Sequence, residues 1–301
     1  MKSNGSTGPR VVGDYLSITK DFLAAKGVDN PRLDAEIMLA AVLGISRLEL
    51  YTGFDRPLAV PEIDRFRDMV RRRAAREPVH YITGIREFWS LDFAVDRRVL
   101  IPRRETELLV ELALERLSKE NGSAVVGNGH QRLADIGTGA GAIAVALASE
   151  IEELRVTATD KSQSVLELAP LNARTHGVGG RIEFVCGDLY EALGGRDPQD
   201  MIVSNPPYVS ESELGALEPE VREWEPRSAL MAGEDGMAVA GPLIAGAPLH
   251  LKPGGWLLVE VGRQWRCVLE CFEQDGWIDV CVHRDLAGIE RVVAGRRPGR
   301  G

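Results

Sequence analysis

The segment from Asp135 to Ala148, "DIGTGAGAIAVALA", joins a short apolar run to an alanine-rich stretch of helical character. Gly137, Gly139 and Gly141 lie between the two. Glycine permits a sharp turn and lets a ligand approach the backbone more closely than any side chain would allow. The segment therefore predicts a strand, a turn and a helix of a doubly wound domain with a ligand at the turn. A tight turn in a doubly wound domain without such a ligand would have the same pattern.

Short apolar runs alternate with helical patterns through the rest of the chain. Strands that alternate with helices indicate a parallel sheet with helices on both faces. The apolar runs occupy residues 132–137, 155–160, 182–188, 201–205, 255–262, 277–283 and 289–296.

The first part of the chain has a different pattern. Apolar residues recur at helical spacing from Val12 to Glu77, and Asn30-Pro31 combines a capping residue with a proline at the first helical position. This spacing predicts an all-helical domain over residues 1–85. The period then becomes alternating, which predicts a hairpin connector over residues 86–103, and residues 104–301 form the main domain.

Two further elements are expected near the start of the main domain. Helical spacing resumes after Pro102 with Leu108, Leu109 and Leu112. Residues 118–131, "SKENGSAVVGNGHQ", are rich in glycine, asparagine and serine and predict a flexible surface loop.

The charge balance limits the partners of the protein. The formal net charge is -9 and the pI is near 5.2, which argues against a protein that binds nucleic acid mainly through its phosphates. Arg71, Arg72, Arg73 and Arg76 are the best candidates for a local basic face. A solvated helix face is the favoured interpretation of these arginines.

No apolar run approaches the roughly 20 residues that a membrane-spanning helix needs. Residues 1–10 lack the apolar core of a secretion signal, so we expect a cytoplasmic protein. The cysteines fit that compartment as reduced thiols. Cys267 and Cys271 could share a helix face, but no nearby histidine completes a ligand set, so we expect no metal site.

Two acidic residues follow the strands next to the glycine turn. Asp160 ends the run 155–160 and Asp188 ends the run 182–188. A carboxylate at the first position can accept hydrogen bonds from both ribose hydroxyls, and one at the second can meet an adenine-type amino group. Each acid by itself could equally cap a helix. With the glycine turn, they indicate an adenosine site, and the G-T-G-A-G spacing differs from the G-x-G-x-x-G pattern of dinucleotide enzymes.

The fourth strand ends beside that site in "IVSNPPYV", residues 202–209. Pro206 and Pro207 have no N–H donor and a restricted φ, so they end strand pairing and hold a rigid turn. The side-chain oxygen of Asn205 and the carbonyl of Pro206 can accept both N–H bonds of a planar NH2 group, with Tyr208 beside it. Such acceptors would orient the nitrogen lone pair of an amide or an aromatic amine. The alternative is a stiff turn without a ligand.

The chain resembles the peptide chain release factor N(5)-glutamine methyltransferases, the HemK/PrmC family, from about residue 14 to residue 297. The glycine turn looks like motif I of the class I methyltransferases. The N-P-P-Y motif also occurs in adenine-N6 methyltransferases, whereas its combination with the helical domain and the connector is specific to this family. The matching motifs, in family order, are "EPVHYITGIREFWSLDFAVDRRVLIPRRETELLVE", "DIGTGAGAIAVALA", "VSNPPYV", "EPRSALMAGEDGM" and "DLAGIERVVAGR".

The resemblance implies a class I S-adenosyl-L-methionine-dependent methyltransferase fold: α/β, Rossmann-like, with a seven-stranded, mostly parallel sheet, a small all-helical N-terminal domain and a β-hairpin connector. It implies transfer of a methyl group from S-adenosyl-L-methionine to the side-chain amide of the glutamine in the Gly-Gly-Gln motif of class 1 peptide chain release factors. The helical domain and the connector would help to grip the release factor. A monomer without direct nucleic-acid contacts is expected.

The same resemblance implies two overlapping sets of site residues. The cofactor would be bound by Gly137, Thr138, Gly139, Ala140, Gly141, Asp160, Asp188, Leu189 and Asn205. The substrate would be bound by Asn205, Pro206, Pro207 and Tyr208, of which Asn205, Pro206 and Tyr208 are the implied catalytic residues.

Three positions depart from the family pattern. Arg104 stands where the family usually has a proline, so we expect a less rigid turn there. Trp224 replaces a phenylalanine, and Leu189 stands where some relatives have tryptophan, so we expect a weaker contact with adenine.

Other functions remain open from the residues. A glutamine methyltransferase of a ribosomal protein would share nearly every catalytic residue. An adenine-N6 methyltransferase of nucleic acid is disfavoured by the acidic charge and by the lack of an extra basic domain. A binding module without activity would predict a broken glycine turn or a lost Asn205, and the sequence has both features intact.

Overall fold

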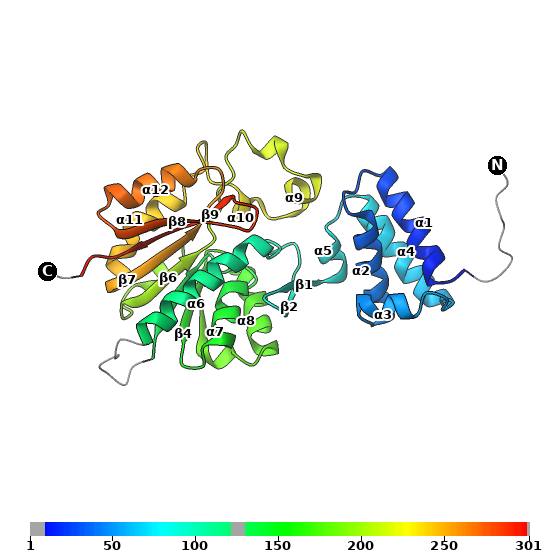
Figure 1. Ribbon diagram of the computed structural model, residues 1–301, viewed down its shortest axis with the longest axis horizontal. Coiled ribbons are helices and arrows are strands. Elements are labelled where there is room, and N and C mark those ends of the chain that lie inside the picture. Colours follow the sequence, from blue (N-terminus) through cyan, green and yellow to red (C-terminus); the bar gives the residue numbers. More distant parts are fainter. Residues whose placement is uncertain (1–9, 122–129, 300–301) are drawn as a thin grey trace. The chain divides into compact units, whose positions relative to one another are not determined.

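The computed structural model describes residues 10–121 and 130–299 of the chain. They divide into two compact units (Figure 1). Each unit has its own apolar core. The N-terminal unit contains Met1–Gly84 together with Pro219–Trp224, and the main unit contains Ile85–Glu218 and Glu225–Gly301. The segment Pro219–Trp224 thus belongs to the first unit although it follows β6 in the chain, which no local sequence pattern indicates.

The N-terminal unit consists of helices. Pro31 begins α2, and Gly44 ends it with a φ of +66°, a conformation that glycine adopts readily. Ser46 caps α3, because its hydroxyl accepts the N–H of Glu49 at 3.3 Å while the Glu49 carboxylate accepts the N–H of Ser46 at 2.7 Å. The helices are α1 (Val12–Ala25), α2 (Pro31–Leu43), α3 (Arg47–Thr52), α4 (Val60–Ala74) and α5 (Val79–Thr83), with α9 (Pro219–Trp224) assigned to the same unit.

The arginines of α4 do not all lie on a solvated face, so the favoured interpretation was wrong for Arg73. This residue is only 6% exposed, and its guanidinium donates to the carboxylates of Asp34 at 2.6 Å and Glu220 at 2.7 Å. Arg76 also donates to Glu220, at 2.6 Å. Asp34 lies in α2 and Glu220 in α9, so these partners are far from Arg73 in the sequence. Helical charge patterns carry no information about such partners.

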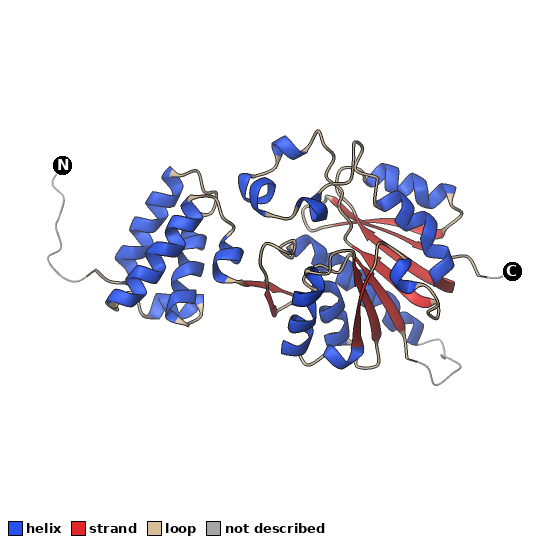
Figure 2. Cartoon of the chain, turned by 180° about the vertical axis from the view of Figure 1, so that it is seen from behind, coloured by secondary structure: helices blue, strands red, loops and turns tan. Residues whose placement is uncertain are grey.

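The main unit contains a seven-stranded sheet with the strand order β5-β4-β3-β6-β7-β9-β8 (Figure 2). The first five strands in this order are parallel, and β9 is antiparallel to both of its neighbours. Each predicted apolar run coincides with a strand, and the predicted fold class is confirmed. The strands are β3 (Arg132–Ile136), β4 (Arg155–Asp160), β5 (Ile182–Cys186), β6 (Gln199–Ser204), β7 (Leu251–Glu260), β8 (Ile278–Arg284) and β9 (Glu290–Arg296).

Helices cover both faces of this sheet (Figures 1 and 2). On one side α6 packs against α7 and α7 against α8, while α11 and α12 pack together against β7 and β9. The core under α11 and α12 is apolar and includes Ile202, Leu243 and Phe272, each fully buried. The helices of this unit are α6 (Glu107–Asn121), α7 (Ala142–Glu150), α8 (Val165–Thr175), α10 (Arg227–Leu230), α11 (Ala240–His250) and α12 (Trp265–Gln274).

Helix α6 runs further than the sequence predicted. It continues to Asn121, so the predicted loop over residues 118–131 was wrong at its first residues. Fully buried Leu117 anchors the last turns, and the polar residues that follow it are compatible with the end of a helix. Residues 122–129 of the predicted loop lie outside the described residues.

The connector is the predicted antiparallel hairpin of β1 (Ile85–Phe88) and β2 (Leu91–Ala94). Trp89 and Ser90 form its tight turn with φ of +53° and +57°. The amide of Asn172 in α8 bonds the N–H and the carbonyl of Ala94 at 2.9 and 3.1 Å, and its Nδ2 also donates to the carbonyl of Ala140 at 2.8 Å. One side chain therefore ties the hairpin to the glycine turn.

A single turn of 3-10 helix, η1 (Arg104–Thr106), leads from the connector into α6. The turn forms even though Arg104 replaces the usual proline. Glu225, only 5% exposed, pairs with Arg103 and accepts the N–H of Ile101 at 3.3 Å. These contacts hold the chain on the N-terminal side of the turn. Across the described parts of the chain, no helix is both long and apolar enough to span a membrane.

Candidate active site

The glycine turn connects β3 to α7 at the carboxyl edge of the sheet. Gly137 and Gly139 have φ of +77° and +55°, a region that side chains disfavour. The N–H groups of Gly137 and Thr138 donate to the carbonyl of Thr159 in β4 at 2.9 and 2.8 Å. A Cβ atom on Gly137 or Gly139 would meet no atom within 4 Å. The turn therefore presents bare backbone to open space.

Gly141 has a different position from the other two glycines. It precedes α7 with a φ of +82°, and a Cβ atom there would lie 3.3 Å from the Cβ of Ala169 in α8. Gly141 thus permits the close packing of α7 against α8, and it does not line the cavity described below.

Asp135 lies behind the turn and is 0% exposed. The Thr138 hydroxyl donates to its carboxylate at 2.6 Å. Burial raises the pKa of Asp135 to about 7, against the opposing effect of the Thr138 hydrogen bond. The hydrogen bond between Thr138 and the buried Asp135 carboxylate stabilises the turn from the protein interior.

Asp160 and Asp188 lie at the ends of β4 and β5. One Asp160 oxygen accepts the N–H of Gly139 at 3.2 Å and the other accepts the N–H of Ser162 at 2.9 Å. A carboxylate oxygen can accept more than one hydrogen bond, so capacity remains for a diol. Burial raises the pKa of Asp160, and the two backbone hydrogen bonds oppose that effect. Asp188 and the following Leu189 line the same cavity.

Asn205 and the two prolines interrupt pairing after β6. Asn205 Nδ2 donates to the Thr106 hydroxyl in η1 at 3.1 Å. Pro206 is buried and Pro207 is half-buried. Pairing resumes at Val209, whose N–H donates to the carbonyl of Leu230 at 2.9 Å. The segment between is therefore held at both ends, and no backbone N–H of the described residues donates to its acceptors.

Tyr208 does not line the main cavity. It lies in a separate groove with Trp265 and Arg291, and its ring packs on Gly262, where a Cβ atom would be only 2.7 Å from the ring. Burial raises the pKa of Tyr208. The sequence placed Tyr208 beside the bound NH2 group, whereas this structure turns it toward β7.

One cavity collects the predicted residues from the ends of four parallel strands. Gly141 and Tyr208 are the two predicted residues outside it. The predicted residues that line it are Gly137, Thr138, Gly139, Ala140, Asp160, Asp188, Leu189, Asn205, Pro206 and Pro207.

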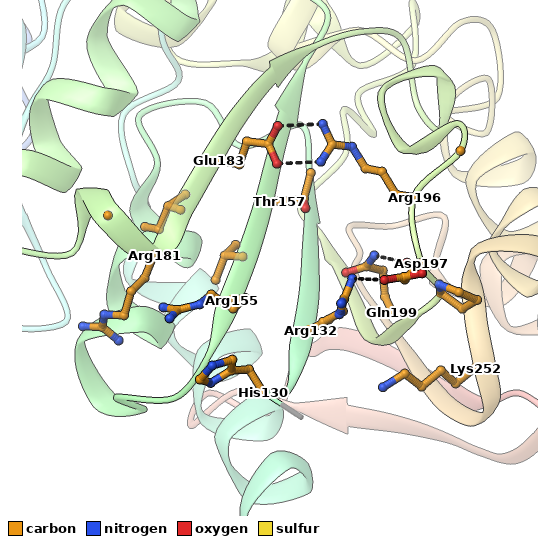
Figure 3. Close-up of a pocket in the computed structure, with 15 residues that line it drawn as sticks. His130, Arg132, Arg155, Thr157, Arg181, Glu183, Arg196, Asp197, Gln199 and Lys252 are labelled. Carbon is orange, nitrogen blue, oxygen red and sulfur yellow. Dashed lines mark hydrogen bonds and ion pairs between the residues drawn. The ribbon is translucent and has the colours of Figure 1, made fainter. Parts of the chain in front are cut away.

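A second cavity opens at the amino edge of the same sheet and is rich in basic residues (Figure 3). Arg196 pairs with Glu183 through two contacts of 2.5 and 2.7 Å, and Arg132 pairs with Asp197 at 2.6 Å. Neighbouring carboxylates thus compensate the charges of Arg196 and Arg132. Ligands of parallel α/β sheets bind at the carboxyl ends of the strands, so the first cavity is the candidate active site.

Sequence reasoning missed two polar residues beside Asn205. Glu260 ends β7 and is 2% exposed, and Thr106 in η1 is 4% exposed. An acid near the end of the apolar run 255–262, followed there only by Val261 and Gly262, is a signal that could have identified Glu260, because Asp160 also ends its strand. Thr106 had no comparable signal, since its contact with Asn205 depends on how η1 packs.

Comparisons with known proteins agree with this architecture. Residues 14–84 match the PrmC N-terminal domain, and residues 110–218 match the methyltransferase small domain. The hMettl16 catalytic domain, solved with the MAT2A 3'UTR hairpin 6, has a TM-score of 0.55 at 18% identity, over 76% of this chain and 82% of that chain. This likeness concerns the fold alone.

The fold and the cavity together define a class I methyltransferase. Release factor glutamine methyltransferases from Geobacter sulfurreducens and Rhodopirellula baltica are 45% and 39% identical to this chain, over 282 and 303 residues. The alignments cover 93% and 98% of this chain and 95% and 99% of those relatives. The chain belongs to the release factor glutamine methyltransferase family.

Proposed function

We propose that the protein transfers a methyl group from S-adenosyl-L-methionine to the side-chain amide nitrogen of the glutamine in the Gly-Gly-Gln motif of class 1 peptide chain release factors. One observation carries this proposal: Asn205 and Pro206 share a cavity with the glycine turn. Similarity to release factor glutamine methyltransferases over 93% and 98% of this chain supports the choice of substrate.

The cavity residues fit S-adenosyl-L-methionine. The open space in front of Gly137 and Gly139 admits the methionine portion against bare backbone. Asp160 retains acceptor capacity for the ribose hydroxyls, and Asp188 and Leu189 would border the adenine. The cofactor has no phosphate group, so its binding site needs no basic side chains to hold one. When bound, it supplies an electrophilic methyl group.

The residues of the protein act on the amide. A glutamine amide nitrogen is a weak nucleophile because its lone pair is delocalised into the carbonyl. Asn205 Oδ1 and the Pro206 carbonyl would accept its two N–H bonds and fix the direction of the lone pair, and positioning of this kind lowers a barrier by several kcal/mol. The methylated nitrogen carries a surplus proton, which these two acceptors hold until it passes to water.

The N-terminal unit offers a surface for a protein substrate. Ile18 and Phe22, one helical turn apart on α1, are 48% and 43% exposed. Apolar side chains at this spacing form a stripe suited to contact with a protein. We assign binding of the release factor to this unit and the hairpin. We further propose that the enzyme acts in the cytoplasm as a monomer.

A ribosomal-protein glutamine is the main rival substrate, since the amide chemistry would be the same. The match of residues 14–84 to the PrmC N-terminal domain favours the release factor. Adenine in nucleic acid is the weaker rival, because the net charge of -9 opposes binding to phosphates.

The decisive test offers all three acceptors together. The protein is incubated with S-adenosyl-L-methionine, an unmodified release factor, the ribosomal protein and an adenine-containing oligonucleotide. Peptide mass spectrometry should locate one added methyl group on the glutamine of the release factor motif. Methyl on the oligonucleotide, or on the ribosomal protein alone, would overturn the proposal.

A further inference from the structure

We infer that Thr106 and Glu260 are positioning residues that fix which end of the Asn205 amide faces the substrate. This inference deepens the proposed function and rests on it, because it concerns how the methyl acceptor is recognised. Neither residue needs to touch the substrate or the cofactor for this role.

The geometry begins with the hydrogen bond from Asn205 Nδ2 to Thr106 Oγ1, at 3.1 Å. An asparagine amide has one donor end and one acceptor end, separated by a half-turn of the side chain. With the donor end on Thr106, Oδ1 is left as an acceptor for a second partner. A substrate NH2 group requires that orientation, because the opposite one would set two donors against each other.

Glu260 determines the direction of this contact. It ends β7 one residue beyond the pairing of Ser204 with Val259, is 2% exposed, and the Thr106 hydroxyl favours its ionised form by lowering its pKa. Its Oε2 atom is buried without a partner among the described residues. An ionised carboxylate is only an acceptor, so it takes the single hydroxyl proton of Thr106. The oxygen of Thr106 can then only accept from Asn205.

Protonation of Glu260 would remove this constraint. A carboxylic acid can donate to Thr106, which frees the hydroxyl proton of Thr106 for Asn205 Oδ1 and allows the amide to turn over. Burial raises the pKa of Glu260 to about 7, and nearby Glu105 acts in the same direction. The Thr106 hydroxyl and the charges of Arg291 and Arg103 lower the pKa of Glu260 and so oppose this shift. The Glu260 carboxylate in turn raises the pKa of the half-buried Tyr208 phenol, after the larger effect of desolvation.

Paired substitutions at Thr106 provide the test. Thr106→Val keeps the shape of the side chain but removes the hydroxyl, whereas Thr106→Ser keeps the hydroxyl. We expect Thr106→Val to lower kcat by about 10- to 100-fold, the range typical when a partner that orients a functional side chain is lost. KM and the calorimetric affinity for S-adenosyl-L-methionine should change by less than about threefold, since positioning acts mainly on the reacting geometry. Thr106→Ser should recover most of kcat.

Glu260→Gln supplies a second readout, the pH profile. The wild-type kcat should fall as the pH drops below about 7, because protonated Glu260 no longer orients the amide. Glutamine cannot ionise, so this acidic limb should disappear in the variant. A purely structural role for Glu260 would lower kcat at every pH without removing the limb.

The methyl acceptor in these assays is whichever of the three the wild-type enzyme modifies. An unexpected acceptor would overturn the proposed function, while the comparison among variants would still test the inference. Equal losses of kcat in Thr106→Val and Thr106→Ser, unchanged kcat in Thr106→Val, or an acidic limb that persists in Glu260→Gln would each overturn the inference.

Discussion

Replacing Glu260 with glutamine should change how the stability of the protein depends on pH. Burial raises the pKa of this carboxyl from 4.5 to about 7 in the folded protein. A carboxyl with a raised pKa holds its proton in the folded chain after the unfolded chain has released it. The contribution of Glu260 to the stability of the folded protein is therefore complete at pH values below the pKa of this carboxyl in the unfolded chain. It is lost as the pH rises through the pKa of the carboxyl in the folded protein.

The magnitude follows from that difference. At about 1.4 kcal/mol for each pH unit that separates the two pKa values, the full effect is about 3 kcal/mol. Most of the loss, about 2 kcal/mol, falls between roughly pH 5.5 and pH 8. The free energy of unfolding of the wild-type protein minus that of Glu260→Gln should decrease by this amount over the interval.

Urea unfolding of both full-length proteins at several pH values measures the difference. Burial also raises the pKa of Asp135 to about 7, so Asp135 titrates over the same pH range in both proteins. Subtracting one curve from the other removes the contribution of Asp135. A difference that stays constant from about pH 5.5 to pH 8, or that grows with pH, would refute the assignment of a buried carboxyl with a raised pKa.

Three further substitutions, two of them paired with a control variant, test other parts of the structure. Asn205→Ala should keep cofactor affinity within a few-fold yet lower turnover by about 100-fold or more, because it removes an acceptor for the substrate amide. Calorimetry measures the cofactor affinity and a methyl-transfer assay measures turnover. Unaltered turnover would exclude Asn205 as the acceptor that orients the substrate. Arg73→Met should reduce the free energy of unfolding of the N-terminal unit by about 3 to 5 kcal/mol, since it strands two buried carboxylates. Arg67→Met, at a side chain 59% exposed, should cost less than about 1 kcal/mol, and similar losses in the two variants would contradict the buried network. Gly236→Ala should impair both stability and turnover, because Gly236 has a φ of +78° and a Cβ atom there would lie 2.6 Å from the Tyr208 carbonyl oxygen. Gly241→Ala is the control, because a Cβ atom at Gly241 would meet no atom within 4 Å. It should leave turnover unchanged and thermal stability equal or slightly raised.

The elements of the fold could be read from the chain because their signals are local. Alternation of apolar runs with helical spacing located the strands of the sheet, and paired signals such as Asn30-Pro31 located helix ends. The site residues at the strand ends were accessible for a related reason. Parallel strands that alternate with helices bring their carboxyl ends to one edge, so Gly137, Asp160, Asp188 and Asn205 had to meet there.

The contacts between elements had no such signal. Thr106 bonds Asn205 across 99 positions of the chain, and Arg73 bonds Glu220 across 147. Neither pair follows a period, because each depends on the rotation and depth at which one element packs against another. The position of Tyr208 is of the same kind, since it follows from the space that Gly262 leaves beside β7.

Local spacing and strand order thus determined which chemical groups this protein gathers at one edge of its sheet. Tertiary packing determined how the side chains of those groups are oriented. It set the donor end of Asn205 against Thr106 and buried Glu260 behind that hydroxyl. The direction of a hydrogen bond depends on which atoms lie opposite each other, and residue identity and spacing do not contain that information.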